Sequence, residues 1–414
     1  MSQEVPKQRC LIIGASHAAA QLAPALRNNG WEGTIGVLGN EYSLPYHRPP
    51  LSKDFLSGKK SLDDILIRQP AVYQKARIHF ALGITVTGID RAGKQIVLDN
   101  DQRIPYDKLV LTTGAHVRKR NIPGADLPGI HYLRDINDIH HIKGFVGQGK
   151  KAVIVGGGYI GLETAASLRK LGMEVTVLEA MSRVLQRVTA PEISAFYTRV
   201  HNEEGVTIVT DTIAKAFEGT KHVETVVCEN GDRFPADLVI VGVGVIPATE
   251  LAEKAGLEVN NGIVVDEYAR TSDHDILAAG DCTWHYNPIY GRHMRLESLQ
   301  NALDQATVAA NTLCGNLKPY SALPWFWSDQ YDMKLQIAGL SQGYDQIVIR
   351  GDKDNSRSFA AFYLQQGRII AADCVNRAQE FMLCKNLIAA GQSVDPVMLA
   401  DEGKTVKELL QAAQ

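Results

Sequence analysis

The sequence predicts an α/β protein with two Rossmann-like dinucleotide-binding domains followed by a C-terminal α+β domain. A strand, a glycine-containing turn, a helix and a second strand occur in that order twice, and each copy closes with another apolar strand. After Pro324 the pattern changes to alternating segments typical of antiparallel strands. A chain of 414 residues is long enough for two or three such domains. Two dinucleotide-binding units in one chain imply two nucleotides.

The first copy begins with an apolar strand over 10–13 and turns at Gly14. A helix is expected over 18–29, with Gly30 as its stop signal, and a second strand over 34–38. The turn departs from the G-x-G-x-x-G pattern because Ser16 and Ala19 occupy the second and third glycine positions. By itself this turn is therefore weak evidence for nucleotide binding.

The residue that would bind the ribose of the first nucleotide stays open between two candidates. The acidic position normally follows the second strand directly, whereas here Asn40 comes first and Glu41 second. Either side chain could accept from a ribose hydroxyl. The copy closes at 106–114, where Asp107 precedes an apolar strand that ends in Thr113 and Gly114.

The second copy matches the dinucleotide-binding pattern in full. An apolar strand over 151–155 leads into Gly156, Gly158 and Gly161, and a helix that includes Ile160 is expected to run to about Leu171. A strand over 174–178 follows, and the copy closes at 237–244 with Gly244. The glycines allow a tight turn, close approach to a pyrophosphate and close contact between helix and strand. The helix N-terminus then faces the phosphates.

Glu179 predicts which nicotinamide nucleotide binds to the second copy. It lies at the end of the next strand, 23 positions after Gly156, where a carboxylate accepts from ribose hydroxyls. The same charge repels a 2′-phosphate, so NADH is favoured over NADPH. Arg183 and Arg187 are counter-evidence because arginines can bind a 2′-phosphate; otherwise they lie in a solvated loop or contact the pyrophosphate.

The last part of the chain predicts a separate α+β domain. Alternating segments over 334–339, 346–350, 358–364 and 368–375 indicate antiparallel strands. One helix is expected over 377–390.

Composition limits the functional classes. The net charge of −3 argues against nucleic-acid binding, and no apolar stretch is long enough for a membrane span. Residues 1–9 lack the layout of a signal peptide, and six scattered cysteines without a C-x-x-C pair indicate buried thiols in a reducing compartment. No histidine or cysteine spacing suggests a metal site. We therefore expect a cytoplasmic protein that binds no metal, no nucleic acid and no membrane.

Four segments outside these patterns resemble one family: Pro45-Tyr46-His47-Arg48-Pro49-Pro50-Leu51-Ser52-Lys53, Ala279-Gly280-Asp281-Cys282, Glu297-Ser298-Leu299-Gln300-Asn301-Ala302 and Pro324-Trp325-Phe326-Trp327-Ser328-Asp329-Gln330-Tyr331. They resemble the FAD-containing, NADH-dependent ferredoxin reductases of bacterial oxygenase systems, over essentially the whole chain. The resemblance implies a glutathione-reductase-like fold. It implies a discontinuous FAD-binding domain of residues 1–114 and 247–322, an NAD-binding domain of 115–246 and a C-terminal domain of 323–414.

The resemblance also implies a set of FAD-binding residues. Ala18 would face the pyrophosphate, Val86 the adenine, and Arg134 the flavin side of the cofactor. Asp281 would bind the ribityl chain, Leu299 would approach the pyrimidine edge of the flavin, and Trp327 the ring region. The full set implied to contact the cofactor is Gly14, Ser16, Ala18, Ala19, Asn40, Glu41, Arg48, Lys53, Val86, Thr113, Gly114, Arg134, Gly280, Asp281, Ser298, Leu299 and Trp327.

Lys53 and Glu163 are implied to meet near the flavin N5. A buried lysine needs a carboxylate partner, and Glu163 is expected in the first turn of the second nucleotide helix, where a negative charge is favourable. The pair would position flavin and nicotinamide rather than exchange protons, since the cofactors supply the chemistry.

Several functions share this scaffold. Thiol-dependent relatives need cysteine in the loop over 41–56, which contains none. The favoured function is transfer of hydride from NADH to FAD, then of single electrons to a two-iron two-sulfur ferredoxin that serves a haem-thiolate monooxygenase. Alternatives are a ring-hydroxylating dioxygenase component, a rubredoxin reductase, or a non-enzymatic flavoprotein resembling apoptosis-inducing factor. Cations expected to dock an acidic ferredoxin are Arg292, Arg295, Lys385 and Lys407.

Overall fold

The computed structural model describes residues 8–413, which fall into two compact units. The first unit comprises residues up to His47, Ser61–His116 and Ile246–Pro324, and the second comprises Arg48–Lys60, Val117–Val245 and the residues from Trp325 onward. Strands β8 (Ala115–Val117) and β17 (Val245–Pro247) contain two of the points where the chain passes from one unit to the other. The predicted absence of a signal peptide concerns residues that lie mostly outside the described part of the chain.

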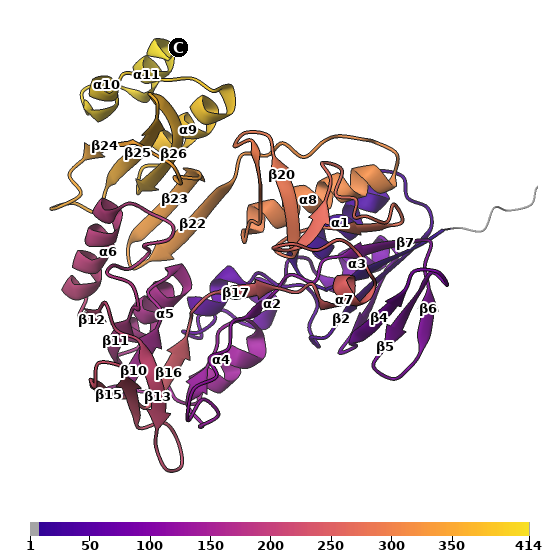
Figure 1. Cartoon of the computed structure of the whole chain (residues 1–414), viewed down its shortest axis with the longest axis horizontal. Coiled ribbons are helices and arrows are strands. Elements are labelled where there is room, and N and C mark those ends of the chain that lie inside the picture. The colour runs from indigo at the N-terminus through magenta and orange to yellow at the C-terminus, as the bar shows by residue number, and fades with distance from the viewer. Residues whose placement is uncertain (1–7, 414) are drawn as a thin grey trace, which may run out of the picture. The chain divides into compact units, whose positions relative to one another are not determined.

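A five-stranded parallel sheet forms the centre of the first unit, in the order β19-β7-β1-β2-β3 (Figure 1). The bounds of its strands are β1 Arg9–Ile13, β2 Thr34–Gly39, β3 Ile78–Leu82, β7 Lys108–Leu111 and β19 Ile276–Ala278. The edge strand β19 comes from far along the sequence. A segment that follows the whole second copy therefore completes this sheet.

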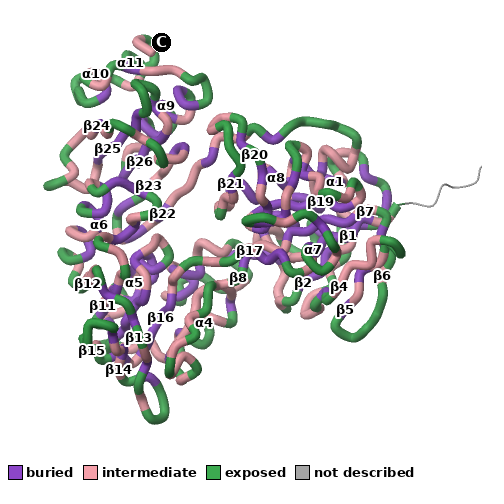
Figure 2. Tube along the Cα trace, in the orientation of Figure 1, coloured by how far each residue is buried: buried purple, intermediate pink, exposed green. Residues whose placement is uncertain are grey.

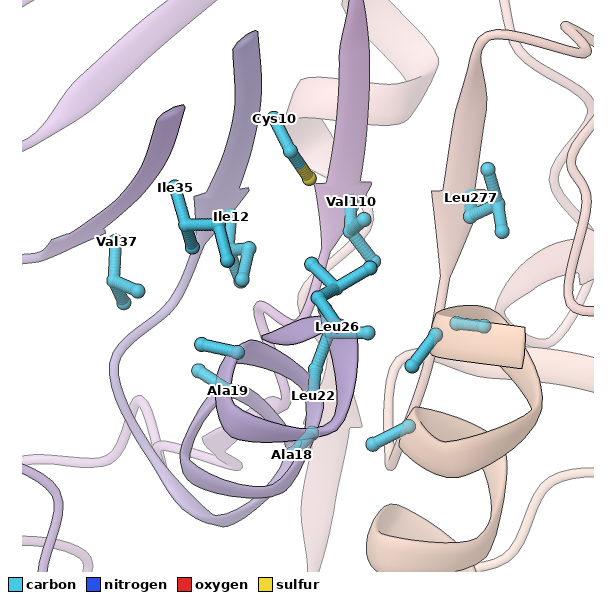
Figure 3. Packing of buried hydrophobic residues seen from close by; sticks show 14 of the residues in the cluster. Cys10, Ile12, Ala18, Ala19, Leu22, Leu26, Ile35, Val37, Val110 and Leu277 are labelled. Carbon is cyan, nitrogen blue, oxygen red and sulfur yellow. The ribbon is translucent and has the colours of Figure 1, made fainter. Parts of the chain in front are cut away.

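Alternate side chains of β1 enter different cores, as the two-residue period of a strand requires. Cys10 and Ile12 pack with helices α1 (His17–Asn28) and α8 (Leu299–Leu313), which Figure 3 shows for α1. Leu11 and Ile13 pack on the opposite face against the three-stranded sheet β4-β5-β6. Apart from the first residue of each strand, β1 and β7 are buried (Figure 2). This two-sided burial explains the nearly continuous apolar sequence of these strands.

The remaining elements of the first unit are short. They are α2 Leu62–Ile65, α3 Pro70–Lys75, β4 Val86–Asp90, β5 Gln95–Leu98, β6 Arg103–Pro105, α7 Glu250–Lys254, β18 Ile263–Val265, β20 Thr283–Asn287 and β21 Arg292–Met294.

The second unit contains a second five-stranded parallel sheet, β12-β11-β10-β16-β9. A three-stranded antiparallel sheet, β13-β14-β15, packs on it much as β4-β5-β6 packs on the first sheet. The bounds are η1 Pro49–Ser52, β9 Ile130–His131, α4 Ile136–Lys143, β10 Lys151–Val155, α5 Tyr159–Lys170, β11 Glu174–Leu178, α6 Pro191–Glu203, β12 Val206–Val209, β13 Ala214–Glu218, β14 Thr225–Cys228, β15 Arg233–Pro235 and β16 Leu238–Val241.

An antiparallel sheet completes the second unit, in the order β22-β23-β26-β25-β24 (Figure 1). The bounds are β22 Trp325–Gln330, β23 Met333–Gly339, β24 Gln346–Gly351, β25 Phe359–Gln365, β26 Arg368–Val375, α9 Ala378–Ala390, α10 Pro396–Ala400 and α11 Val406–Ala412. The four predicted strands and the predicted helix are present. The strand missed by the sequence patterns is β22, which lies in the Pro324–Tyr331 motif.

The repeated closing segments have one structural cause. The Asp107 carboxylate accepts from the backbone N–H of Arg9 at 2.6 Å, and the Asp237 carboxylate accepts from that of Lys151 at 2.8 Å. In each copy this bond joins the start of the closing strand to the start of the opening strand. The parallel α/β prediction is confirmed, while the three-domain division stays a prediction. No described helix has the length and apolar character needed to cross a membrane.

Candidate active site

The first glycine turn joins β1 to α1 and allows no side chain at Gly14. Its φ is +107°, and an added Cβ would lie 2.2 Å from the carbonyl oxygen of Thr112. Helix α1 begins at His17, one residue before the prediction, so Ala18 and Ala19 lie in its first turn. The N–H groups of a first turn have no acceptor within the helix, and they face anions favourably. This turn fits a pyrophosphate even though Ser16 replaces glycine.

The ends of β1 and β2 bring the ribose candidates to this turn. A Cβ on Gly39 would lie 2.5 Å from the Cβ of Ala15, so Asn40 and Glu41 follow directly beside the turn. The Tyr46 hydroxyl donates a hydrogen bond to Glu41. The backbone N–H of Gly83 donates to the Glu41 carbonyl at 3.0 Å, which places the segment before buried Val86 alongside.

Two other segments of the first unit that are predicted to bind FAD lie at the N-terminal ends of helices. A Cβ on Gly280 would lie 3.7 Å from the Cβ of Ala18, so the segment that includes Asp281 lies against the first turn of α1. Ser298 caps α8, its hydroxyl accepting from the Asn301 N–H at 3.2 Å, and Leu299 begins the helix. Elsewhere in the unit, Thr113, which precedes Gly114, donates to the Ala248 carbonyl at 2.7 Å.

The second glycine turn has the same geometry as the first. Gly156 has a φ of +114°, and an added Cβ would lie 2.3 Å from the carbonyl oxygen of Gly242. At Gly161 an added Cβ would lie 2.1 Å from the carbonyl oxygen of Gly156. At Gly158, in contrast, it would meet no described atom within 4 Å. Gly156 and Gly161 thus serve chain packing, whereas Gly158 leaves an open approach, as a bound pyrophosphate needs. Ile160 is 49% exposed at the same helix start.

Glu179 organises this turn from the end of β11. Its Oε2 accepts from the Gly157 N–H at 2.7 Å, and its Oε1 accepts from the Met181 N–H at 2.8 Å. A carboxylate has about four lone-pair sites, so two remain for ribose hydroxyls.

The two arginines near Glu179 differ. Arg183 donates to the Thr189 carbonyl at 2.9 Å and to the Ser194 hydroxyl at 2.7 Å, so it supports its own loop. Arg187 is exposed, and it remains the arginine of this loop predicted to contact the nucleotide. Gly244, with φ +100°, ends the closing segment of this copy.

Lys53 and Glu163 meet in the second unit. The Lys53 Nζ lies 2.6 Å from Glu163 Oε2, and the side chains are 19% and 8% exposed. The Ser52 hydroxyl also donates to Oε2, at 2.8 Å, and the Ser328 hydroxyl donates to Oε1 at 2.7 Å. The position of Glu163 differs from the prediction: it is the fifth residue of α5, beyond the first turn, because the helix begins at Tyr159. The ion pair with Lys53 and the two serine hydroxyls, rather than the helix dipole, stabilise the negative charge of Glu163.

Arg48, Arg134 and Trp327 are the other predicted flavin residues of this unit. Arg48 donates to the backbone carbonyl of Arg134 at 2.6 Å, so these two lie together. Trp327 lies on β22 one residue before Ser328, with its ring centroid 5.5 Å from that of Trp325. The predicted flavin residues of this unit therefore come from the two ends of η1, from α5, from β22 and from the segment before α4.

Comparison with known proteins defines the family. Residues 8–306 match the pyridine nucleotide-disulphide oxidoreductase family, and residues 325–410 match the reductase C-terminal domain. The chain is 43% identical to putidaredoxin reductase CamA of Pseudomonas putida over 98% of this chain and 97% of that protein. The chain belongs to this oxidoreductase family, among its ferredoxin reductases. The reductase uses FAD and NADH.

Two further similarities cover nearly the whole length of the reductase. It is 41% identical, over 99% of this chain and 100% of that protein, to the 5,5′-dehydrodivanillate O-demethylase ferredoxin reductase subunit of Sphingobium sp.. It also matches the reductase in the crystal structure of a covalent putidaredoxin reductase–putidaredoxin complex, with a TM-score of 0.95, 42% identity and 99% coverage of both chains. The predicted glutathione-reductase-like α/β fold with a C-terminal domain is confirmed.

Sequence reasoning missed four polar residues around Glu163. Ser52 and Ser328 are within the quoted motifs but have no chemical signature of their own. Gln330 Nε2 donates to the Ser328 hydroxyl at 3.1 Å, and His201 Nε2 lies 2.8 Å from Gln330 Oε1. No sequence signal connects His201 with this group. It lies on α6, 129 positions from Gln330, and only the fold brings the two side chains together.

Proposed function

We propose that the reductase passes single electrons from NADH, through FAD, to a two-iron two-sulfur ferredoxin that serves a haem-thiolate monooxygenase in the cytoplasm. One observation is the main support. In the segment 41–56, where thiol-dependent relatives need cysteine, this chain has Lys53, which pairs with Glu163. The flavin edge would therefore meet a charge pair rather than a thiol, which favours transfer of electrons out of the protein.

The two glycine turns, their ribose-binding residues and the Lys53–Glu163 pair have proposed roles. FAD, when bound, accepts a hydride from NADH and can release electrons one at a time. The glycine turn after β1 would bind the FAD pyrophosphate, and Asn40 or Glu41 its ribose. The turn after β10 would bind the NADH pyrophosphate, and Glu179 its ribose. Lys53, held by Glu163, would orient the rings for transfer.

The ferredoxin would dock against cations of the protein surface. Lys385 is half-buried, with its Nζ 5.3 Å from the ring centre of Trp325, while Lys407 is exposed on α11, which packs on α9. In the first unit Arg292 is exposed, but Arg295 pairs with Glu297. Because a paired arginine adds little to the electrostatic field of the surface, Arg295 is the weakest of the four candidates.

A panel of purified acceptors tests this proposal. NADH-driven cytochrome c reduction is measured with no mediator, with a ferredoxin of a haem-thiolate system, with a ferredoxin of a ring-hydroxylating dioxygenase, and with a rubredoxin. We expect the highest kcat/KM with the first ferredoxin. A higher value with the dioxygenase ferredoxin or with rubredoxin would transfer the assignment to that system, and no stimulation by any of them would refute the proposal.

A dioxygenase or demethylase acceptor is the second candidate. The relative from Sphingobium, which is nearly as similar in sequence, is named for an O-demethylase system. A reductase component named for an anthranilate 1,2-dioxygenase system, from Burkholderia cepacia, is 41% identical over 97% of this chain.

A further inference from the structure

A line of hydrogen bonds leads from Glu163 through β22 to α6, inside the second unit. Ser328 donates to Glu163 Oε1 at 2.7 Å, and Gln330 donates to Ser328 at 3.1 Å. His201 Nε2 lies 2.8 Å from Gln330 Oε1, and the Tyr331 hydroxyl lies 3.2 Å from His201 Nδ1. Ser328, Gln330 and His201 are 0%, 2% and 0% exposed. Such a buried network is costly unless its members satisfy one another.

The partners give this line a single direction. Gln330 uses its amide nitrogen toward Ser328, so its oxygen faces His201, which must donate from Nε2. Burial lowers the pKa of His201, so the neutral ring is favoured and its Nδ1 can accept from Tyr331. Every donor of the line therefore points toward the Glu163 carboxylate.

The two oxygens of Glu163 are held by different donors. Lys53 and Ser52 both donate to Oε2, whereas Ser328 donates to Oε1. The last torsion angle of a glutamate side chain is only weakly restricted. A carboxylate that accepts hydrogen bonds at one oxygen only can therefore rotate about this bond. Ser328 removes this freedom, and its own hydroxyl is fixed because it accepts from Gln330.

We propose that Ser328, oriented by Gln330 and His201, is a positioning residue for flavin reduction by NADH. It fixes the Glu163 carboxylate so that the Lys53 ammonium is held at one place. The same strand presents neighbouring Trp327 from its other face, because side chains alternate along a strand. This inference rests on the proposed roles of Lys53 and Glu163.

The test measures single-turnover flavin reduction by NADH in FAD-loaded variants. Ser328→Ala should slow reduction about tenfold, the scale of one lost hydrogen bond to a charged group, and Ser328→Thr should restore the rate to within about threefold. Gln330→Leu, which leaves Ser328 present but unoriented, should give a smaller loss. Ser328→Ala should add nothing further in a Glu163→Gln background.

Thr189→Val is the matched control. Thr189 is a buried hydroxyl in the same unit that donates to another buried carboxylate, that of Asp373, at 2.6 Å. This variant should lose a similar amount of thermal stability with no change in reduction rate. A control as slow as Ser328→Ala would show that the effect is general destabilisation and would overturn the inference.

Three other outcomes are decisive. If Ser328→Ala reduces at the wild-type rate while Glu163→Gln is slow, the inference fails and the role of Glu163 stands. If Glu163→Gln is itself as fast as wild type, the proposed role of the pair and this inference fail together. Should Ser328→Ala not fold, a Gln330→Leu enzyme with the wild-type rate overturns the inference, and a slow one supports it.

Discussion

Removing both members of the Lys53–Glu163 pair should cost less than the sum of the two single removals. Breaking a buried ion pair from one side costs about 3–5 kcal/mol, because the other charge loses its partner. Lys53 is 19% exposed, so water reduces this cost to roughly 1–3 kcal/mol here.

The two single substitutions should differ in size. Lys53→Met leaves Glu163, only 8% exposed, with the two serine hydroxyls as its donors. Glu163→Gln leaves a more exposed lysine that still reaches the Pro49 carbonyl at 3.3 Å. We therefore expect about 2–3 kcal/mol for Lys53→Met and about 1–2 kcal/mol for Glu163→Gln.

The double variant removes both charges and should cost less than the sum of the singles by about 1–2 kcal/mol. Urea unfolding of the FAD-loaded enzymes measures this coupling, and stopped-flow reduction by NADH shows whether the singles also slow the flavin step. Lys60→Met, at a lysine whose side chain is 45% exposed and whose Nζ lies 3.8 Å from its acidic neighbour, is the control and should change neither. Strictly additive costs and unchanged reduction rates would refute the reasoning.

Three other predictions concern selectivity, docking and pH. Glu179→Gln should lower the kcat/KM ratio of NADH over NADPH about a hundredfold, because it removes the charge that repels a 2′-phosphate; an unchanged ratio would show that Glu179 does not select the nucleotide. Reversing charge at Lys385 and Lys407 together should slow ferredoxin reduction about tenfold at low salt without changing flavin reduction, and the wild-type ferredoxin rate should fall as ionic strength rises; salt-independent turnover and an unaffected double variant would place docking elsewhere. Burial raises the pKa of Asp373 from 3.8 to about 6, so the folded protein holds this proton more tightly and loses about 3 kcal/mol of stability as pH rises from about 4 through 6. Asp373→Asn should remove this pH-dependent loss of stability, so the change in urea midpoint between pH 4 and pH 7 should differ between the variant and the wild-type protein. An identical change in both proteins would contradict the prediction.

The sequence by itself determined the two nucleotide-binding units. Gly14 and Gly156 can be identified from the chain because a strand that turns directly into a helix leaves no room for a Cβ. An added Cβ would indeed lie 2.2 Å from a facing carbonyl oxygen at Gly14 and 2.3 Å from one at Gly156. Local spacing also located Glu179, since the ends of adjacent parallel strands meet at one edge of the sheet. These are short-range constraints, so the pattern of neighbouring residues records them.

Tertiary structure alone decided how the charge pair is held. Lys53 and Glu163 are 110 positions apart, and the resemblance to a family, rather than any spacing, suggested that they meet. The Ser52 hydroxyl reaches Glu163 from η1, next to Lys53, and the Ser328 hydroxyl reaches it from β22. The ring of His201, on α6, connects to Ser328 through Gln330. Serine and histidine occur everywhere on folded chains, so their residue type alone carries no such information. Their role depends on which strand lies against which helix, and long-range packing fixes that after the local patterns have formed the elements.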